Sequence, residues 1–211
     1  MKKIITLFAA IALAAAPAFS QIIPGAGYIN STLTSGSSSD TQNGFYAGAS
    51  MEMGFSSVKG LSFVPGAYLS FLTSTGTTSG DLWIISGSSK STFTEVAINV
   101  PAYIKFGASL SGGARVFAYA GPTAQLGIIS QTKTDTKTSG IISGESSSID
   151  DYYSGDRGFN RFNLYVGGGV GFGFNQFSLN VGYDYGLMNV LRGVDKNANR
   201  ANLHVGINIA L

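Results

Sequence analysis

The chain has 211 residues, no cysteine and only 11% charged residues, with 13 Lys and Arg against 11 Asp and Glu. This length fits one domain, and the nearly balanced charge gives the protein no electrostatic reason to bind nucleic acid. The lack of cysteine excludes a disulfide framework, a thiolate metal site and the lipidated cysteine of bacterial lipoproteins.

The first twenty residues have the pattern of a secretory signal. Residues 2–3 are lysines, residues 4–16 are apolar, and small residues precede Gln21. The apolar run is too short for a comfortable transmembrane span, which disfavours a retained anchor. We therefore expect a signal peptide over residues 1–20, with residues 21–211 forming a single domain.

Apolar and polar residues alternate with a period of two in eight later segments, which predicts eight β-strands with one apolar face each. The predicted strands, in chain order, are Gly25 to Leu33, Gly44 to Phe55, Leu61 to Ser74, Ser91 to Phe106, Arg115 to Ser130, Arg161 to Phe174, Phe177 to about Val190, and Ala201 to Leu211. The first strand has the weakest pattern. There we expect the following directions: Ile29 and Leu33 outward, and Tyr28, Asn30 and Thr32 inward.

Three prolines fall inside predicted strands, at Pro65, Pro101 and Pro122. Because proline cannot donate a hydrogen bond to the ladder, we expect bulges or kinks at these positions.

The links between the strands alternate strictly between long and short. The short links are residues 56–60, 107–114 and 175–176, and the long ones, rich in Ser, Thr, Gly, Asp and Asn, are residues 34–43, 75–90, 131–160 and 191–200. In an up-and-down barrel this order places every long loop at one rim, as in outer-membrane barrels with long external loops.

The sequence thus predicts an all-β fold, an eight-stranded antiparallel up-and-down transmembrane β-barrel with its apolar face toward lipid. The 29 glycines and 12% aromatic residues fit such a barrel, in which strands bend and aromatic girdles mark the membrane interfaces. We expect a monomer in the bacterial outer membrane, with lipid as its partner and its loops available to a surface ligand or protein.

The inward positions carry most of the charge in the strands. These residues are Glu52, Glu95, Asp184, Lys105, Arg115 and Arg161. Since an unpaired charge in a narrow lumen is costly, we expect a neutralised structural network. The alternative is a path for protons or solutes, but a lumen of eight strands is only wide enough for side chains.

We expect no catalytic residue, metal site or cofactor. His204, the single histidine, is predicted to face inward with Asp184 nearby, but no serine has a diagnostic spacing to them. Residues 167–171 are glycine-rich but lack the lysine and the strand-to-helix context of a phosphate loop. The acidic and aromatic residues 150–153 could form a calcium site or a recognition tip, and we interpret them as a solvated loop.

Several segments together resemble the small outer-membrane β-barrel family common in Bacteroidetes, labelled porin-like or PorT-like. They are residues 97–105, 119–124, 162–173 and 181–190, followed by the closing strand. The resemblance implies an outer-membrane barrel from a family in which most members have no assigned activity. We therefore predict a structural or surface-interaction role. The alternatives are a lipid-modifying enzyme and a secreted soluble barrel that binds a small apolar ligand.

Overall fold

The structure is a computed structural model that describes residues 22–82, 85–140, 144–156, 158–193 and 196–210. The predicted signal peptide lies outside the described residues. Among the described residues, no helix is both long and apolar enough to cross a membrane.

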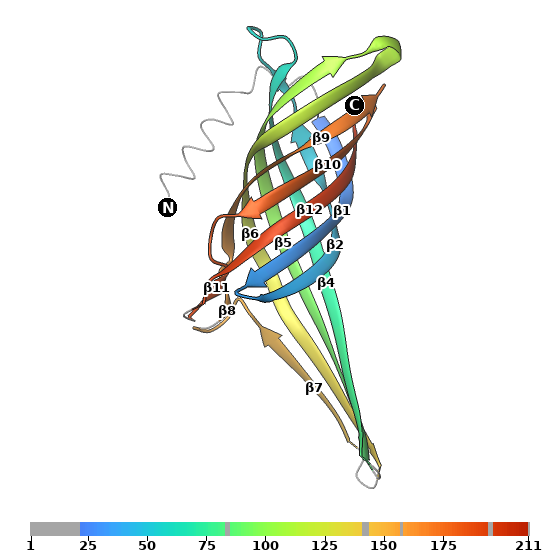
Figure 1. The fold of residues 1–211 in the computed structure, drawn as a ribbon, viewed down its shortest axis with the longest axis vertical. Coiled ribbons are helices and arrows are strands. Elements are labelled where there is room, and N and C mark those ends of the chain that lie inside the picture. Colours follow the sequence, from blue (N-terminus) through green and yellow to red (C-terminus); the bar gives the residue numbers. More distant parts are fainter. Residues whose placement is uncertain (1–21, 83–84, 141–143, 157, 194–195, 211) are drawn as a thin grey trace.

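Eight long strands form a closed antiparallel ring (Figure 1). They are β1 (Ile22–Ser35), β2 (Ser38–Met51), β4 (Leu61–Leu82), β5 (Ile85–Ser109), β6 (Ala114–Gly140), β9 (Phe162–Phe174), β10 (Phe177–Gly186) and β12 (Ala198–Ile209). Their order around the ring is β2-β1-β12-β10-β9-β6-β5-β4, and β4 pairs back onto β2. The predicted up-and-down barrel is therefore confirmed.

Shorter elements complete the fold. They are β3 (Met53–Gly54), which continues β2 along β4, β7 (Gly144–Asp151), which pairs with β6, the separate pair β8 (Gly158–Phe159) and β11 (Leu191–Arg192), and a 3-10 turn at Ser111–Gly113. We call the end where β1 begins and β12 ends the terminal rim, and the opposite end the loop rim.

The ring closes with a stagger. Asn30 on β1 pairs directly with Asn43 on β2. The same Asn30 can also be followed from partner to partner in the other direction, through β12, β10, β9, β6, β5 and β4, and this path ends on β3 at Met53. Met53 lies ten residues from Asn43, and this offset is the shear of the barrel. Such a shear tilts the strands against the barrel axis and fixes the barrel's width.

Apolar side chains cover the outside of the ring. Val100, Phe172 and Ile207 are 46%, 47% and 52% exposed on the outer surface. Inward residues are buried, as at Glu95 and Asp184, with 1% and 7% exposure. This polarity fits a barrel in lipid and argues against a soluble barrel that encloses an apolar ligand.

The prediction for the first strand is wrong in its direction. Tyr28 pairs with Phe45 on β2 and Val205 on β12, and all three side chains are exposed outside. Ile29 is 7% exposed and lines the lumen. The same reversal applies to the other predicted positions, with Leu33 inward and Asn30 and Thr32 outward. Glycines leave few side chains in this strand to define a face, so the neighbouring strands decide it.

The three prolines interrupt the ladder without a bulge. They lie side by side on β4, β5 and β6, and the pairing of β4 with β5 breaks off after Pro65. The pairing of β5 with β6 breaks off after Pro101, next to Pro122, and resumes with equal numbers of residues on both strands. The register shift of this ladder lies elsewhere: Val96 pairs with Ile129 and Ala97 with Gly127, so β6 carries the extra residue.

Large side chains from β2 and β6 fill the lumen by lying against inward glycines of β9, β10 and β12. A methyl group added at Gly171 would lie 2.2 Å from Cζ of Phe117. One added at Gly206 would lie 2.1 Å from the hydroxyl oxygen of Tyr46. These glycines therefore do more than let strands bend, because they leave the space that the rings occupy.

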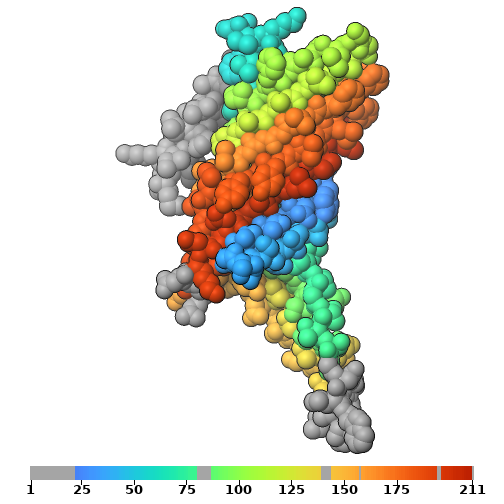
Figure 2. All heavy atoms as spheres, viewed as in Figure 1, coloured from blue at the N-terminus to red at the C-terminus, as the bar shows by residue number. Residues whose placement is uncertain are grey.

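Three strands of the ring continue far past the loop rim (Figures 1 and 2). Residues 74–82 of β4, 85–94 of β5 and 131–140 of β6 pair with one another, and β7 adds a fourth strand. We call this four-stranded extension the projecting sheet. At about 3.3 Å per residue it reaches about 25 Å beyond the barrel. The predicted long loops 75–90 and 131–160 are thus largely β-structure.

Replacing an inward glycine tests the packing of the lumen. We expect Gly171→Leu to lower the free energy of unfolding by about 1–3 kcal/mol, because the new side chain overlaps Phe117. The matched control is Val170→Leu on the outer face, where the side chain is 57% exposed. Urea unfolding in lipid vesicles measures both variants, and equal stability of Gly171→Leu and the parent would contradict this packing.

Candidate functional site

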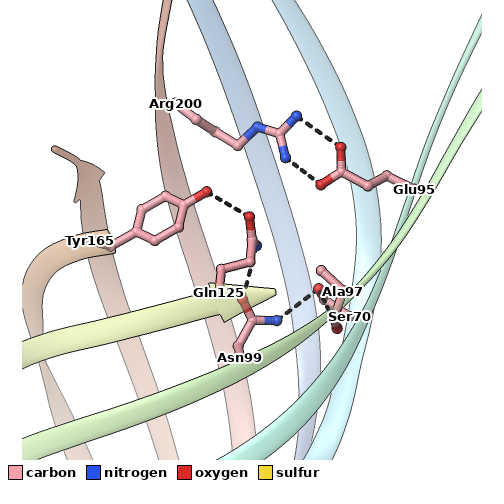
Figure 3. A network of polar contacts seen from close by, with 7 residues as sticks. All are labelled: Ser70, Glu95, Ala97, Asn99, Gln125, Tyr165 and Arg200. Carbon is pink, nitrogen blue, oxygen red and sulfur yellow. Dashed lines mark hydrogen bonds and ion pairs between the residues drawn. The ribbon is translucent and has the colours of Figure 1, made fainter. Parts of the chain in front are cut away.

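A buried ion pair closes the lumen at the loop rim (Figure 3). Both terminal nitrogens of Arg200 on β12 donate to the two carboxylate oxygens of Glu95 on β5, and the Nη2 to Oε2 distance is 2.9 Å. The side chains are only 3% and 1% exposed. Such bidentate geometry offsets part of the large cost of burying two charges.

A chain of side-chain hydrogen bonds crosses the lumen beside this pair (Figure 3). The hydroxyl of Tyr165 donates to Oε1 of Gln125 over 3.0 Å, and Nε2 of Gln125 donates to Oδ1 of Asn99 over 2.9 Å. Nδ2 of Asn99 then donates to Oγ of Ser70 over 2.8 Å. Because Tyr165 and Ser70 are each 1% exposed, this layer blocks the lumen.

Tyr153, in the turn after β7, covers the blocked layer of the lumen from the side of the loop rim. It is 7% exposed and lies so close to Gly127 that a methyl group there would meet its hydroxyl at 1.8 Å. Burial raises the pKa of Tyr153 above its ordinary value. Arg161 lies over the Tyr153 ring, 5.1 Å from its centre, and is exposed. The prediction that Arg161 points into the lumen is therefore wrong, because β9 begins one residue later, at Phe162.

A second ion pair lies near the terminal rim. Lys105 on β5 pairs with Glu52, which also accepts a hydrogen bond from Oγ of Ser62 over 2.8 Å. Arg115 extends along Gly173 of β9, and its positive charge also reaches Glu52. The Lys105 and Glu52 side chains keep 16% and 29% exposure, so solvent reaches this end of the lumen.

Asp184 occupies the middle level of the lumen. The hydroxyl of Tyr103 lies 3.4 Å from each of its carboxylate oxygens, and Nε2 of His204 lies 3.5 Å from Oδ2. These contacts are long for charge-assisted hydrogen bonds. Asp184 is nevertheless 7% exposed.

The inward charges thus form three separate levels. Of the six predicted residues, Glu52, Lys105 and Arg115 lie together, whereas Asp184 and Glu95 each lie at another level. The buried partner of Glu95, Arg200, was missed because residues 191–200 have the composition of a loop, whereas β12 begins at Ala198. The sequence did indicate the direction of Arg200, because it is separated by two and four residues from Asn202 and His204, which point inward.

His204, the histidine considered for a hydrolase site, lies against two aromatic rings in the lumen. His204 packs its ring against Tyr46 and Tyr119, with ring centres 6.1 and 6.5 Å away. Its Nε2 has no hydrogen-bond partner among the described residues.

The acidic segment at residues 150–153 is partly ordered by its own contacts. Asp151 accepts a hydrogen bond from the backbone nitrogen of Tyr153 over 2.8 Å, while Tyr152 stacks on Phe159. Within the described part of the chain, no group of three or more His, Asp or Glu side chains could hold a metal ion.

The projecting sheet is hydrophilic on both faces. Hydroxyl groups pair across its strands, as Ser89 with Thr136 at 3.3 Å and Ser91 with Thr134 at 3.1 Å. One face also carries exposed ion pairs, such as Lys137 with Glu145 at 2.9 Å. This sheet buries no apolar face of its own, so it contributes little to the stability of the barrel.

Both edges of the projecting sheet are open. β4 pairs with β2 only as far as Thr73, and β7 pairs with β6 but with no further strand in the described structure. The open edge of β7 carries Glu145, Asp150 and Asp151, whereas the edge of β4 from Ser74 to Gly80 carries no charge. Charged edges resist strand addition, and uncharged ones permit it.

The sequence profile of a family described as "Outer membrane protein beta-barrel domain" matches residues 15–192. The chain belongs to this family. The protein is therefore an integral β-barrel protein of the bacterial outer membrane. The short turns of the terminal rim face the periplasm, and the projecting sheet lies outside the cell.

Two of the solved structures that are similar to the chain come from Neisseria and from Yersinia pestis. Neisserial surface protein A is 14% identical, with 89% of this chain and 96% of that chain covered and a TM-score of 0.45. Ail, the attachment invasion locus protein of Yersinia pestis, is 13% identical, with 90% and 98% covered and a TM-score of 0.41. Likenesses this distant carry no argument about function. No curated protein matches the chain.

Breaking the ion pair at the loop rim tests its structural role. We expect Glu95→Gln to lower the free energy of unfolding by about 3–5 kcal/mol, because Arg200 is left buried without a counter-charge. Replacing both residues by Leu and Met recovers most of that loss. The exposed pair provides the control, since Glu145→Gln leaves the urea midpoint unchanged. A Glu95→Gln midpoint equal to that of the parent would refute the assignment.

Proposed function

We propose that this outer-membrane barrel is an anchor that presents the projecting sheet to macromolecular partners outside the cell. The observation that carries the proposal is the continuation of β4, β5 and β6 past the membrane, joined by β7. Neighbouring antiparallel strands can be joined by as few as two residues. The much longer hairpins are therefore not needed to close the barrel.

The chemistry of the projecting sheet favours contact with other macromolecules. Its hydroxyl-bearing faces remain hydrated, while its open edges offer main-chain donors and acceptors. An extended segment of a partner protein can add to such an edge as a further strand. The uncharged edge of β4, from Ser74 to Gly80, is the better acceptor of the two.

We assign the lumen a structural role and propose no catalytic activity. The blocked layer formed by Glu95, Arg200, Tyr165 and Gln125 supports this assignment, because a solute would have to break a buried ion pair to pass. The glycines that receive the lumenal rings likewise favour a filled barrel. We also propose that the protein is a monomer and that it belongs to the PorT-like branch found in Bacteroidetes, which the sequence resembles.

Removing the projecting sheet separates anchoring from binding. In one variant, residues 75–92 and residues 132–150 are each replaced by Asn-Gly, joining Ser74 to Phe93 and Gln131 to Asp151, which are already paired. We expect this variant to keep the gel migration of a folded barrel but to lose adhesion of expressing cells to immobilised fibronectin, collagen and mucin. Adhesion equal to that of the full-length protein would contradict the proposal.

A further inference from the structure

Under-satisfied polar atoms gather at the middle level of the lumen. Among the described residues, the Asp184 carboxylate contacts the hydroxyl of Tyr103 at 3.4 Å and Nε2 of His204 at 3.5 Å, and the second contact is an ion pair only when the imidazole is protonated. The buried atoms Nε2 of His204, the hydroxyl of Tyr119 and Oδ1 of Asn202 have no hydrogen-bond partner among the described residues. A buried carboxylate is costly unless a counter-charge or hydrogen bonds compensate it. With a neutral His204, this level offers an anion to a positively charged ligand.

Aromatic rings surround the same space. Tyr103 and Tyr119 lie with ring centres 5.0 Å apart, and Tyr46 packs edge-on to His204. The charge of Asp184 reaches Tyr46 and Tyr119 as well as Tyr103. Faces of aromatic rings attract organic cations, most strongly where water is displaced. Rings combined with one carboxylate form a suitable environment for an alkylammonium group.

A cavity makes this level accessible from the periplasm. Its volume is about 140 Å³, and its lining runs from Asp184 and His204 down to Glu52, Lys105 and Arg115. A cavity of only about 10–15 Å³ holds one water, so this cavity has room for a larger molecule. The periplasmic end keeps solvent contact, whereas the ion pair at the loop rim closes the external end.

The basic residues of the periplasmic mouth are engaged away from Asp184, because Lys105 pairs with Glu52. Asp184 lies against Gly167, and Arg115 lies against Gly173 of the same strand. Six residues of a strand span about 20 Å. In the described structure neither Lys105 nor Arg115 forms an ion pair with Asp184, and Glu52 balances the charge of Lys105 at the mouth.

From this geometry we propose that the lumen holds a periplasmic binding site for a small organic ammonium ion. Its ammonium group pairs with Asp184, and its carbon substituents contact the rings of Tyr46, Tyr103 and Tyr119. This site is independent of the projecting sheet and of any partner that the sheet binds.

Choline and its uncharged isostere 3,3-dimethyl-1-butanol are the probes that test the site. The full-length protein is purified in an uncharged detergent, and its thermal unfolding is followed by gel migration together with calorimetric titration. We expect choline to raise the unfolding temperature, because a ligand that binds the folded state stabilises it. The isostere, which lacks the charge, leaves the unfolding temperature unchanged.

Variants locate the effect. Asp184→Asn keeps the shape of the side chain and weakens choline binding at least tenfold, whereas Asp135→Asn in the projecting sheet leaves it unchanged. Should Asp184→Asn fail to fold, Tyr119→Phe and Tyr119→Leu form a second matched pair, in which only the loss of the ring weakens binding.

Three results would overturn the proposal. They are no response to choline, an equal response to its uncharged isostere, and stabilisation by Mg²⁺ or Ca²⁺ without stabilisation by choline. The last would indicate a metal site.

Discussion

The structure depends on the closure of its sheet. Inside a bilayer no water can pair with main-chain groups, so every strand needs a hydrogen-bonded neighbour on both sides. The pairing of β2 with β4 supplies the last of these neighbours and removes both sheet edges from the lipid. Past the membrane this requirement lapses, and there the same strands continue as a sheet with open edges. The contrast separates the anchoring part of the chain from the part available for binding.

Closure also determines what the lumen can be. An eight-stranded ring leaves room only for side chains, so inward residues must fit one another in volume and in charge. Volume is matched by placing Tyr46 and Phe117 against glycines of other strands. Charge is matched in pairs at the two ends, by Glu95 with Arg200 and by Glu52 with Lys105. At the middle level, the described basic group within 4 Å of Asp184 is His204, whose Nε2 lies 3.5 Å from Oδ2.

The period of two was sufficient to predict the ring, because a lipid-facing side and a filled lumen impose opposite polarity on alternate residues. It failed where that contrast vanishes. In β1 the glycines hid the direction of Tyr28 and Ile29. In the projecting sheet, Ser and Thr occupy both faces, so no apolar pattern marked the strands. Arg200 was missed for the same reason, since β12 enters the barrel from a polar segment. Pairing partners across the ring are set by the stagger, which sequence periodicity does not encode.

The most direct test of this account is the direction of the side chains in the bilayer. Because the chain has no cysteine, single cysteines from Val96 to Tyr103 along β5 can be spin-labelled without background reactivity. In phospholipid vesicles, oxygen accessibility should be high at Ile98 and Val100 and low at Ala97 and Asn99, because alternate side chains of β5 face lipid and lumen. Labels at Val100 and Ile98 that collided with a water-soluble nickel reagent rather than with oxygen would contradict a barrel with its apolar face in lipid.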